Sequence, residues 1–202
     1  MKKRLTMVYL FSKLIIWPIL RLFIKKIEGV ENLPNKQFIM VANHGSYIDA
    51  LLLIILVAWY KNKQLCFFAT KDRFMGPIWS IVFDHFGAIR VNGSIEKARK
   101  ALRQGKCLGL FPEGQRTFTG KIQKATHKGL GIIALLSKAP IVPVGLNTYK
   151  FWNRKQLLPN LKTNIKITIG KPMKFKGKTS QAKKVVKTVM KEVSRLARIS
   201  NT

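Results

Sequence analysis

The stretch QFIMVANHGSYIDALLLIILVAWY, residues 37–60, changes its hydrophobic pattern in the middle. Its first part, residues 37–42, is a short apolar run with the length and composition of a buried β-strand. The residues NHG, 43–45, are typical of a turn. Ser46 then stands three residues before Asp49 and ahead of an apolar run, which is the pattern of a helix N-cap and its third residue. The stretch therefore predicts a strand, a turn and a helix.

Apolar runs of strand length alternate with helical segments through the rest of the chain. The predicted strands are residues 37–42, 65–69, 87–91, 107–111, 140–146 and 164–169, and the predicted helices are residues 47–60, 73–84, 94–105, 127–138 and 180–198. Because the strands are continuous apolar runs, helices should cover both faces of the sheet. The sequence thus predicts an α/β fold with a mostly parallel or mixed central sheet and helices on both faces.

Residues 5–24, LTMVYLFSKLIIWPILRLFI, form the most apolar long stretch. Its length approaches the roughly 20 residues of a membrane-spanning helix. Two basic residues lie within it, however, and Pro18 should kink it. We therefore expect an amphipathic anchor in the interface of an anionic leaflet, with Trp17 and Tyr9 at headgroup level. A single spanning helix and a buried core helix are the alternatives.

The 202 residues suit one domain with an addition at each end. The predicted parts are an N-terminal membrane-anchoring helical segment (residues 1–27), a main domain (residues 28–175) and a basic C-terminal amphipathic helix (residues 176–202). In that last helix the apolar side chains share one face and lysines occupy the other. Such a helix can dock on the domain or lie on a membrane.

Charge is the most unusual feature of the composition. The chain has 38 Lys and Arg against 8 Asp and Glu, a formal net charge of +30. Such a surface attracts anionic lipids, nucleic acids and acidic proteins. The apolar N-terminal segment and the lack of a recognised nucleic-acid motif favour a lipid surface. We expect the protein at the cytoplasmic face of the cell membrane, peripheral or held by a single anchor.

The two cysteines and three histidines give no metal-binding pattern. Cys66 and Cys107 both lie inside apolar runs, so we expect reduced core residues rather than a disulfide. His85 and His127 lack an acidic residue at a spacing that would orient the ring. No metal site is expected.

His44 and Asp49 are five residues apart. On one continuous helix their side chains would point about 140° apart. If His44 lies in the turn before the helix, its ring can fold back so that Asp49 accepts the Nδ1–H and Nε2 is free to act as a general base. The alternative is a capping box beside an incidental surface histidine.

Residues 107–117, CLGLFPEGQRT, place a second polar group at the end of a predicted strand. Arg116 follows a glycine-containing turn, which suits phosphate binding by a guanidinium and backbone amides. Glu113 follows a core strand, where ligand-binding residues gather in α/β sheets. The alternative is an ion pair between Glu113 and Arg116 that stabilises the turn.

Together these segments resemble the glycerolipid acyltransferase family, specifically the 1-acyl-glycerol-3-phosphate (lysophosphatidic acid) acyltransferases. The resemblance covers residues 28–175, which would be the acyltransferase domain. The family's first block, N-H-x4-D, matches Asn43, His44 and Asp49, its third block, F-P-E-G-x-R/T, matches Phe111, Pro112, Glu113, Gly114, Arg116 and Thr117, and its fourth matches Val142, Pro143 and Val144. The second block departs from the pattern, because Gly93 holds the usual arginine position and Arg90 stands three residues earlier.

The resemblance implies direct transfer of a fatty acyl chain from an acyl-CoA or acyl-carrier-protein thioester to 1-acyl-glycerol-3-phosphate, giving phosphatidic acid in phospholipid synthesis. It implies no cofactor beyond that co-substrate. It assigns catalysis to His44 and Asp49 and substrate binding to Glu113, Gly114, Arg116, Thr117 and Arg90. The implied partners are the membrane lipid acceptor, an anionic membrane surface and an acyl-carrier protein, without nucleic acid.

The displaced Arg90 keeps other acceptors open, namely glycerol-3-phosphate or a lysophospholipid. A basic nucleic-acid-binding protein is the alternative from another class.

Overall fold

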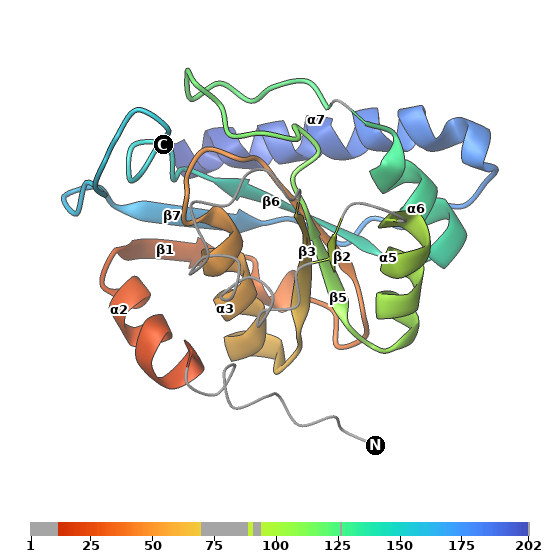
Figure 1. Ribbon diagram of the computed structural model, residues 1–202, viewed down its shortest axis with the longest axis horizontal. Helices are drawn as coiled ribbons and strands as arrows, with labels where there is room; N and C mark the ends of the chain where they lie inside the picture. The colour runs from red at the N-terminus through yellow and green to blue at the C-terminus, as the bar shows by residue number, and fades with distance from the viewer. Residues whose placement is uncertain (1–11, 70–88, 91–93, 126, 202) are drawn as a thin grey trace.

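The computed structural model describes residues 12–69, 89–90, 94–125 and 127–201. Within these residues seven strands form one sheet in the order β1-β7-β6-β2-β5-β3-β4 (Figure 1). The strands are β1 (Ile24–Glu28), β2 (Ile39–Ala42), β3 (Leu65–Ala69), β4 (Ile89–Arg90), β5 (Cys107–Leu110), β6 (Ile141–Leu146) and β7 (Ile165–Ile169). The helical elements are η1 (Ser12–Ile16), α2 (Trp17–Arg21), η2 (Val30–Asn32), α3 (Asp49–Lys61), α5 (Ser94–Arg103), α6 (Gly129–Ser137), η4 (Thr179–Gln181) and α7 (Ala182–Asn201).

The sheet is mixed, as the sequence predicts. Strands β1 and β7, and all neighbours from β6 through β2, β5 and β3 to β4, pair in parallel, whereas β6 and β7 pair antiparallel. Because β2, β5 and β6 run in the same direction side by side, their carboxyl ends meet at one edge of the sheet. The loops that follow these three strands carry the candidate site.

Strand β2 shows why the sheet is covered on both faces. Successive side chains of a strand point to opposite sides. Phe38 and Met40 join one buried cluster with α3 and the N-terminal segment, and Ile39 and Val41 join a second one with α5, α6 and α7. The fold is therefore a three-layer α/β/α arrangement.

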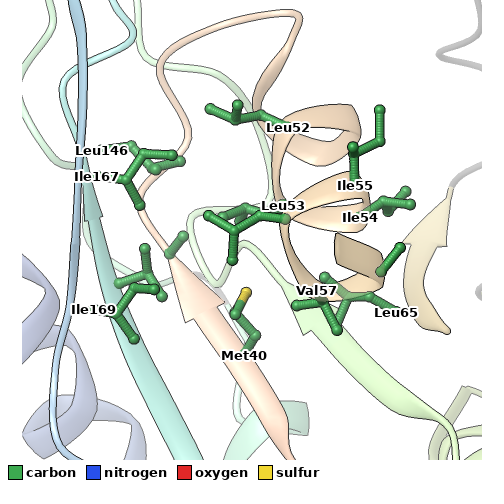
Figure 2. Packing of buried hydrophobic residues seen from close by; sticks show 14 of the residues in the cluster. Met40, Leu52, Leu53, Ile54, Ile55, Val57, Leu65, Leu146, Ile167 and Ile169 are labelled. Atoms are coloured by element: carbon green, nitrogen blue, oxygen red, sulfur yellow. The ribbon is translucent and has the colours of Figure 1, made fainter. Parts of the chain in front are cut away.

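Helix α3 is apolar around most of its circumference because it is packed deeply into the first cluster. All seven residues from Leu52 to Ala58 are buried. Figure 2 shows Leu52 and Leu53 beside the side chains of β6 and β7, and Val57 beside Leu65 of β3. This packing fixes the position of the helix whose first residue is Asp49.

One difference from the predicted elements has a clear physical reason. Strand β1 was not predicted, because its sequence IKKIE lacks the apolar run of a central strand. Lys25 and Lys26 are exposed there, as suits the edge position of β1. Residues 24–27, assigned from the sequence to the anchoring segment, thus belong to the sheet. The predicted helix 73–84 lies outside the described residues.

The N-terminal segment packs on the domain through one side. Pro18 stands at the start of α2, directly after the π-helical turn η1. The prediction that Trp17 lies at headgroup level is wrong, because its side chain is only 4% exposed and stacks on Trp59 of α3 at 5.6 Å between ring centroids. Tyr9 lies outside the described residues. In the described part of the chain, no helix combines the length and apolarity that a membrane crossing requires.

Helix α7 docks on the domain, which decides between the two placements left open by the sequence. Its apolar face, including Val189 and Val193, is buried in the second cluster. The helix approaches β6 closely at Gly145, where an added Cβ would lie 2.3 Å from the backbone nitrogen of Ala197. The Ser200 hydroxyl also donates to the Gly145 carbonyl at 3.1 Å.

We expect Gly145→Ala to lower the free energy of unfolding by about 1–3 kcal/mol, because the new methyl group must push α7 away from β6. Gly129→Ala is the matched control, since a Cβ there meets nothing within 4 Å. Denaturant unfolding followed by circular dichroism measures both. Equal stability of the two variants would contradict the close approach.

Candidate active site

The candidate active site lies where the carboxyl ends of β2, β5 and β6 meet. His44 and Asp49 follow β2, the segment from Glu113 to Thr117 follows β5, and Thr148 follows β6. Parallel pairing of β2 with both neighbours brings the three loops together. Asn43 reinforces this arrangement, because its side-chain amide donates to the Leu146 carbonyl at 2.9 Å and accepts from the Leu146 amide at 2.8 Å.

The predicted contact between His44 and Asp49 is present. His44 lies in the turn before α3, and its Nδ1 is 2.9 Å from Asp49 Oδ2. An ionised carboxylate only accepts hydrogen bonds, so Nδ1 carries the proton and Nε2 holds the ring's free lone pair. The neutral ring then has the tautomer that a general base working through Nε2 requires.

Asp49 is completely buried and accepts four hydrogen bonds. Besides His44, its Oδ2 accepts the backbone amides of Gly45 and Ser46, each at 2.8 Å. Its Oδ1 accepts the hydroxyl of Thr148. As the first residue of α3, it also lies at the positive end of the helix dipole. The carboxylate is therefore held in one orientation without needing water.

The predicted N-cap at Ser46 is present only in part. Helix α3 begins at Asp49 rather than at residue 47, and the residue before it makes no side-chain cap. The Ser46 hydroxyl donates to the Trp152 carbonyl at 2.9 Å and accepts the Ile48 amide at 3.4 Å. The carboxylate of Asp49 accepts the amide of Ser46, as in a capping box, whereas the Ser46 oxygen accepts the amide of Ile48 rather than that of Asp49.

An aromatic stack supports one face of the His44 ring. The ring lies nearly parallel to Phe111, with 4.0 Å between centroids and 7° between planes. Phe111 stacks in turn on Phe67 of β3 at 4.9 Å. The His44 side chain is 15% exposed, so the imidazole is largely enclosed but still reaches solvent. The hydrogen bond and the stack together fix the position of the ring and the orientation of its plane.

Glu113 is buried, and its two oxygens bind backbone rather than the Arg116 side chain predicted as one alternative. Oε1 accepts the His44 amide and Oε2 accepts the Gln123 amide, both at 2.8 Å. The pKa of Glu113 is raised to about 7, chiefly by burial, while the nearby Asp49 carboxylate adds to the rise and the two backbone amides oppose it. The carboxylate thus links the loop after β5 to the backbone of the histidine.

The other predicted binding residues of this loop lie around the same turn. Gly114 adopts a left-handed conformation with φ of 75°, which favours glycine. Thr117 donates its amide to the His44 carbonyl at 2.9 Å. The Arg116 guanidinium lies 4.0 Å from the centre of the Tyr47 ring, a cation–π contact. The structure therefore brings Gly114, Arg116 and Thr117 to the histidine loop.

The other residues considered in the sequence analysis are not shown in contact with the His44–Asp49 pair. Arg90 ends β4, which two strands, β5 and β3, separate from β2, at the same edge of the sheet. His127 is exposed, and His85 lies outside the described residues. Cys66 and Cys107 are buried free thiols, and burial raises the pKa of Cys107 to about 12. In the part of the chain that the structure describes, no group of three His, Cys, Asp or Glu side chains is arranged to hold a metal ion.

Thr148 is the site residue that sequence reasoning missed. It is fully buried, and its hydroxyl binds the carboxylate oxygen of Asp49 that faces away from His44. The signal was its position two residues beyond β6, at the carboxyl end of a core strand. Its separation of 99 residues from Asp49 hid the contact.

Comparisons with known proteins find relatives of this chain. The family model described as Acyltransferase matches residues 25–147. Among curated relatives, the 1-acyl-sn-glycerol-3-phosphate acyltransferase of Cocos nucifera is 32% identical over 141 residues, 65% of this chain and 44% of its own length. The probable enzyme of that name from Mycoplasma pneumoniae is 30% identical over 61% of this chain and 50% of its own length. The Bacillus subtilis enzyme is 28% identical over 73% of both chains.

This chain therefore spans about half the length of the first two of these relatives. A similar fold is found in the crystal structure of the 1-acyl-sn-glycerophosphate (LPA) acyltransferase PlsC from Thermotoga maritima, with a TM-score of 0.73 and 23% identity over 98% of this chain and 83% of that one. The matched region of the family model contains both the His44–Asp49 pair and the loop after β5. The chain belongs to the acyltransferase family.

Proposed function

We propose that this chain transfers a fatty acyl group from a thioester to the free hydroxyl of 1-acyl-glycerol-3-phosphate, giving phosphatidic acid. The observation that carries the proposal is the hydrogen bond between His44 Nδ1 and the buried carboxylate of Asp49. The family and the names of its relatives in Cocos nucifera and Bacillus subtilis support the reaction class.

The chemistry needs one proton acceptor beside the acceptor hydroxyl. His44 Nε2 takes the hydroxyl proton as the oxygen attacks the thioester carbonyl, and Asp49 stabilises the imidazolium that forms. The tetrahedral intermediate then breaks its C–S bond, and the imidazolium returns the proton to the leaving thiolate. The new ester bond completes phosphatidic acid, and no acyl-enzyme is formed.

The oxyanion of that intermediate needs hydrogen-bond donors outside residues 44–47. Every backbone amide of this segment already has an acceptor: Glu113 for His44, Asp49 for Gly45 and Ser46, and the Trp152 carbonyl for Tyr47. Donation by the amides of this turn would break the contacts that hold the pair.

The acceptor phosphate is assigned to the side of the site where Arg116 lies. Arg116, stacked on Tyr47 beside the histidine loop, is the guanidinium that we propose for it, with Gly114 and Thr117 shaping the turn. Glu113 takes a different role from the binding one that the family pattern implied. A buried carboxylate that accepts two backbone amides positions the His44 loop, and it would repel a phosphate.

Charge supports the membrane and donor assignments. A net charge of +30 suits an anionic leaflet at the cytoplasmic face and a phosphate-bearing donor, either acyl-CoA or an acidic acyl-carrier protein. We propose no further cofactor. Glycerol-3-phosphate and lysophospholipids remain the alternative acceptors, because Arg90 is displaced from the family position.

Replacing the proposed base tests the function directly. We expect His44→Ala to lower kcat by about 10²–10⁴-fold, the contribution of a positioned general base. Phosphatidic acid formation is measured in vesicles carrying 1-acyl-glycerol-3-phosphate, with acyl-CoA and acyl-carrier-protein donors in separate reactions. His127→Ala, which changes an exposed histidine, is the control. Near-normal turnover by His44→Ala would rule out the proposed mechanism. A preference of the wild type for another acceptor would rule out 1-acyl-glycerol-3-phosphate as the main substrate.

Thr148 should act through Asp49 rather than on the substrate. Thr148→Val keeps the shape but leaves a buried carboxylate oxygen without its hydroxyl donor, so we expect kcat to fall about tenfold while KM changes little. Thr148→Ser restores the hydroxyl and should restore most of the rate. If the serine variant is as slow as the valine variant, Thr148 serves packing alone.

The raised pKa of Glu113 should appear in the stability of the protein. Burial disfavours the charged form in the folded state, so the unfolded chain binds fewer protons between the ordinary value of 4.5 and about 7. The Glu113 contribution to the free energy of unfolding must then fall as pH rises through this window. Glu113→Gln cannot ionise, so the difference in unfolding free energy, wild type minus variant, should decrease over the same range. A difference independent of pH would contradict the shift.

A further inference from the structure

The loop between β6 and β7 turns three leucines outward. Leu157 is 90% exposed, Leu158 73% and Leu161 60%. Scattered exposed leucines are ordinary, but three within five positions of one loop form a protruding apolar tip. We call residues 154–162 the leucine loop.

The leucine loop is held in shape by its own hydrogen bonds. The Asn160 amide donates to the Phe151 carbonyl at 2.7 Å, and the Asn153 amide donates to the Gln156 side chain at 2.7 Å. The side chains of Asn153 and Asn160 accept the amides of Lys155 and Lys162. The exposure of the leucines is therefore a property of an ordered turn.

The charges around the leucine loop have one sign. Lys150, Lys155 and Lys162, which lie near the leucines in the sequence, are exposed, and the whole sequence from residue 114 to 191 contains no Asp or Glu. Exposed leucines with exposed lysines nearby in the sequence match an anionic bilayer, where hydrocarbon receives the leucines and the lysines reach headgroups.

The segments on both sides of the leucine loop pack against the N-terminal segment, which carries further exposed apolar residues. Phe151 packs on Phe23 at 5.6 Å between ring centroids, and the Ile165 amide donates to the Phe23 carbonyl at 2.8 Å. Leu22 beside this contact is 81% exposed. In Figure 1 the loop before β7 and helix α2 lie at the same end of the molecule. Leu14, Ile15 and Ile19 are also exposed.

The β6–β7 connection, which contains the leucine loop, is tied to the candidate active site. The β6–β7 connection holds Asp49 through Thr148, and its Trp152 carbonyl accepts the Ser46 hydroxyl and the Tyr47 amide. A partner surface that binds the leucine loop therefore also lies at a fixed distance from His44.

We propose that the leucine loop is a membrane-docking element, which inserts Leu157, Leu158 and Leu161 into an anionic bilayer beside the exposed N-terminal apolar residues. The inference deepens the proposed function, on which its catalytic purpose rests, since it brings the site to a bilayer-embedded acceptor. Docking itself needs only the loop, the lysines and the bilayer.

Vesicle binding tests the proposal. The variant carrying Leu157→Ser, Leu158→Ser and Leu161→Ser should bind vesicles of phosphatidylglycerol and phosphatidylcholine with a partition coefficient at least about tenfold lower than wild type. Leu136→Ser is the matched control, since Leu136 is a 43% exposed leucine of α6, far from the leucine loop. It should bind within about twofold of wild type. Equal binding by the triple variant and the control would overturn the inference.

A labelled cysteine gives a second readout. Leu158→Cys can be labelled selectively with a polarity-sensitive dye, because Cys66 and Cys107 are buried. Its emission should shift to the blue on adding anionic vesicles, whereas a dye at Leu136→Cys should not respond. A shift with acyl-carrier protein alone, or leucine-dependent self-association without vesicles, would assign the surface to another occupant and overturn membrane docking.

The binding assays separate this inference from the proposed reaction. Run in a His44→Ala background, they report docking without turnover, while a dispersed short-chain acceptor reports turnover without docking. Lost binding with normal turnover on the dispersed acceptor in the triple serine variant supports the docking role. Normal binding by that variant rejects docking, whatever the activity assay gives.

Discussion

The carboxylate of Asp49 is the point through which three parts of the fold are joined. Asp49 is the first residue of α3. Its carboxylate accepts backbone amides of the turn that follows β2 and the hydroxyl of Thr148 from the loop after β6. A fully buried charge is tolerated only when donors replace water. Four donors do so here, and one of them is the imidazole of His44. The interaction that makes the carboxylate acceptable in the core therefore also fixes the ring of the histidine.

A second buried carboxylate works on the same turn from the other side. Glu113 accepts the amide of His44, while Thr117 donates to the His44 carbonyl. The peptide groups on both sides of the histidine are thus held from the loop after β5. Burial removes water from the Glu113 carboxylate, and the raised pKa of Glu113 reflects this cost. The same contacts leave the backbone of His44 little freedom to move. Preorganisation of this kind is what general-base catalysis requires of its scaffold.

The same contacts relate the site to the proposed docking surface. Trp152 lies in the β6–β7 connection and binds the turn through its carbonyl, and its neighbour Phe151 packs on Phe23 of the N-terminal segment. A short covalent path therefore joins the groups that hold Asp49 to the exposed leucines. Because the connection is ordered by its own asparagine contacts, movement of the leucine loop relative to His44 should be small.

The sequence by itself determined the layered α/β fold and the pairing of His44 with Asp49. Both are local in origin: each central strand is a continuous apolar run, and only a turn allows residues five apart to meet before a helix. Tertiary structure decided the rest. The edge strand β1 exists because β7 offers a partner, Trp17 is buried because α3 lies beside it, and the Ser46 hydroxyl donates to the carbonyl of the distant Trp152. The roles of Glu113 and Thr148 depend on amides and oxygens supplied by other loops, which meet only because parallel strands end at one edge of the sheet.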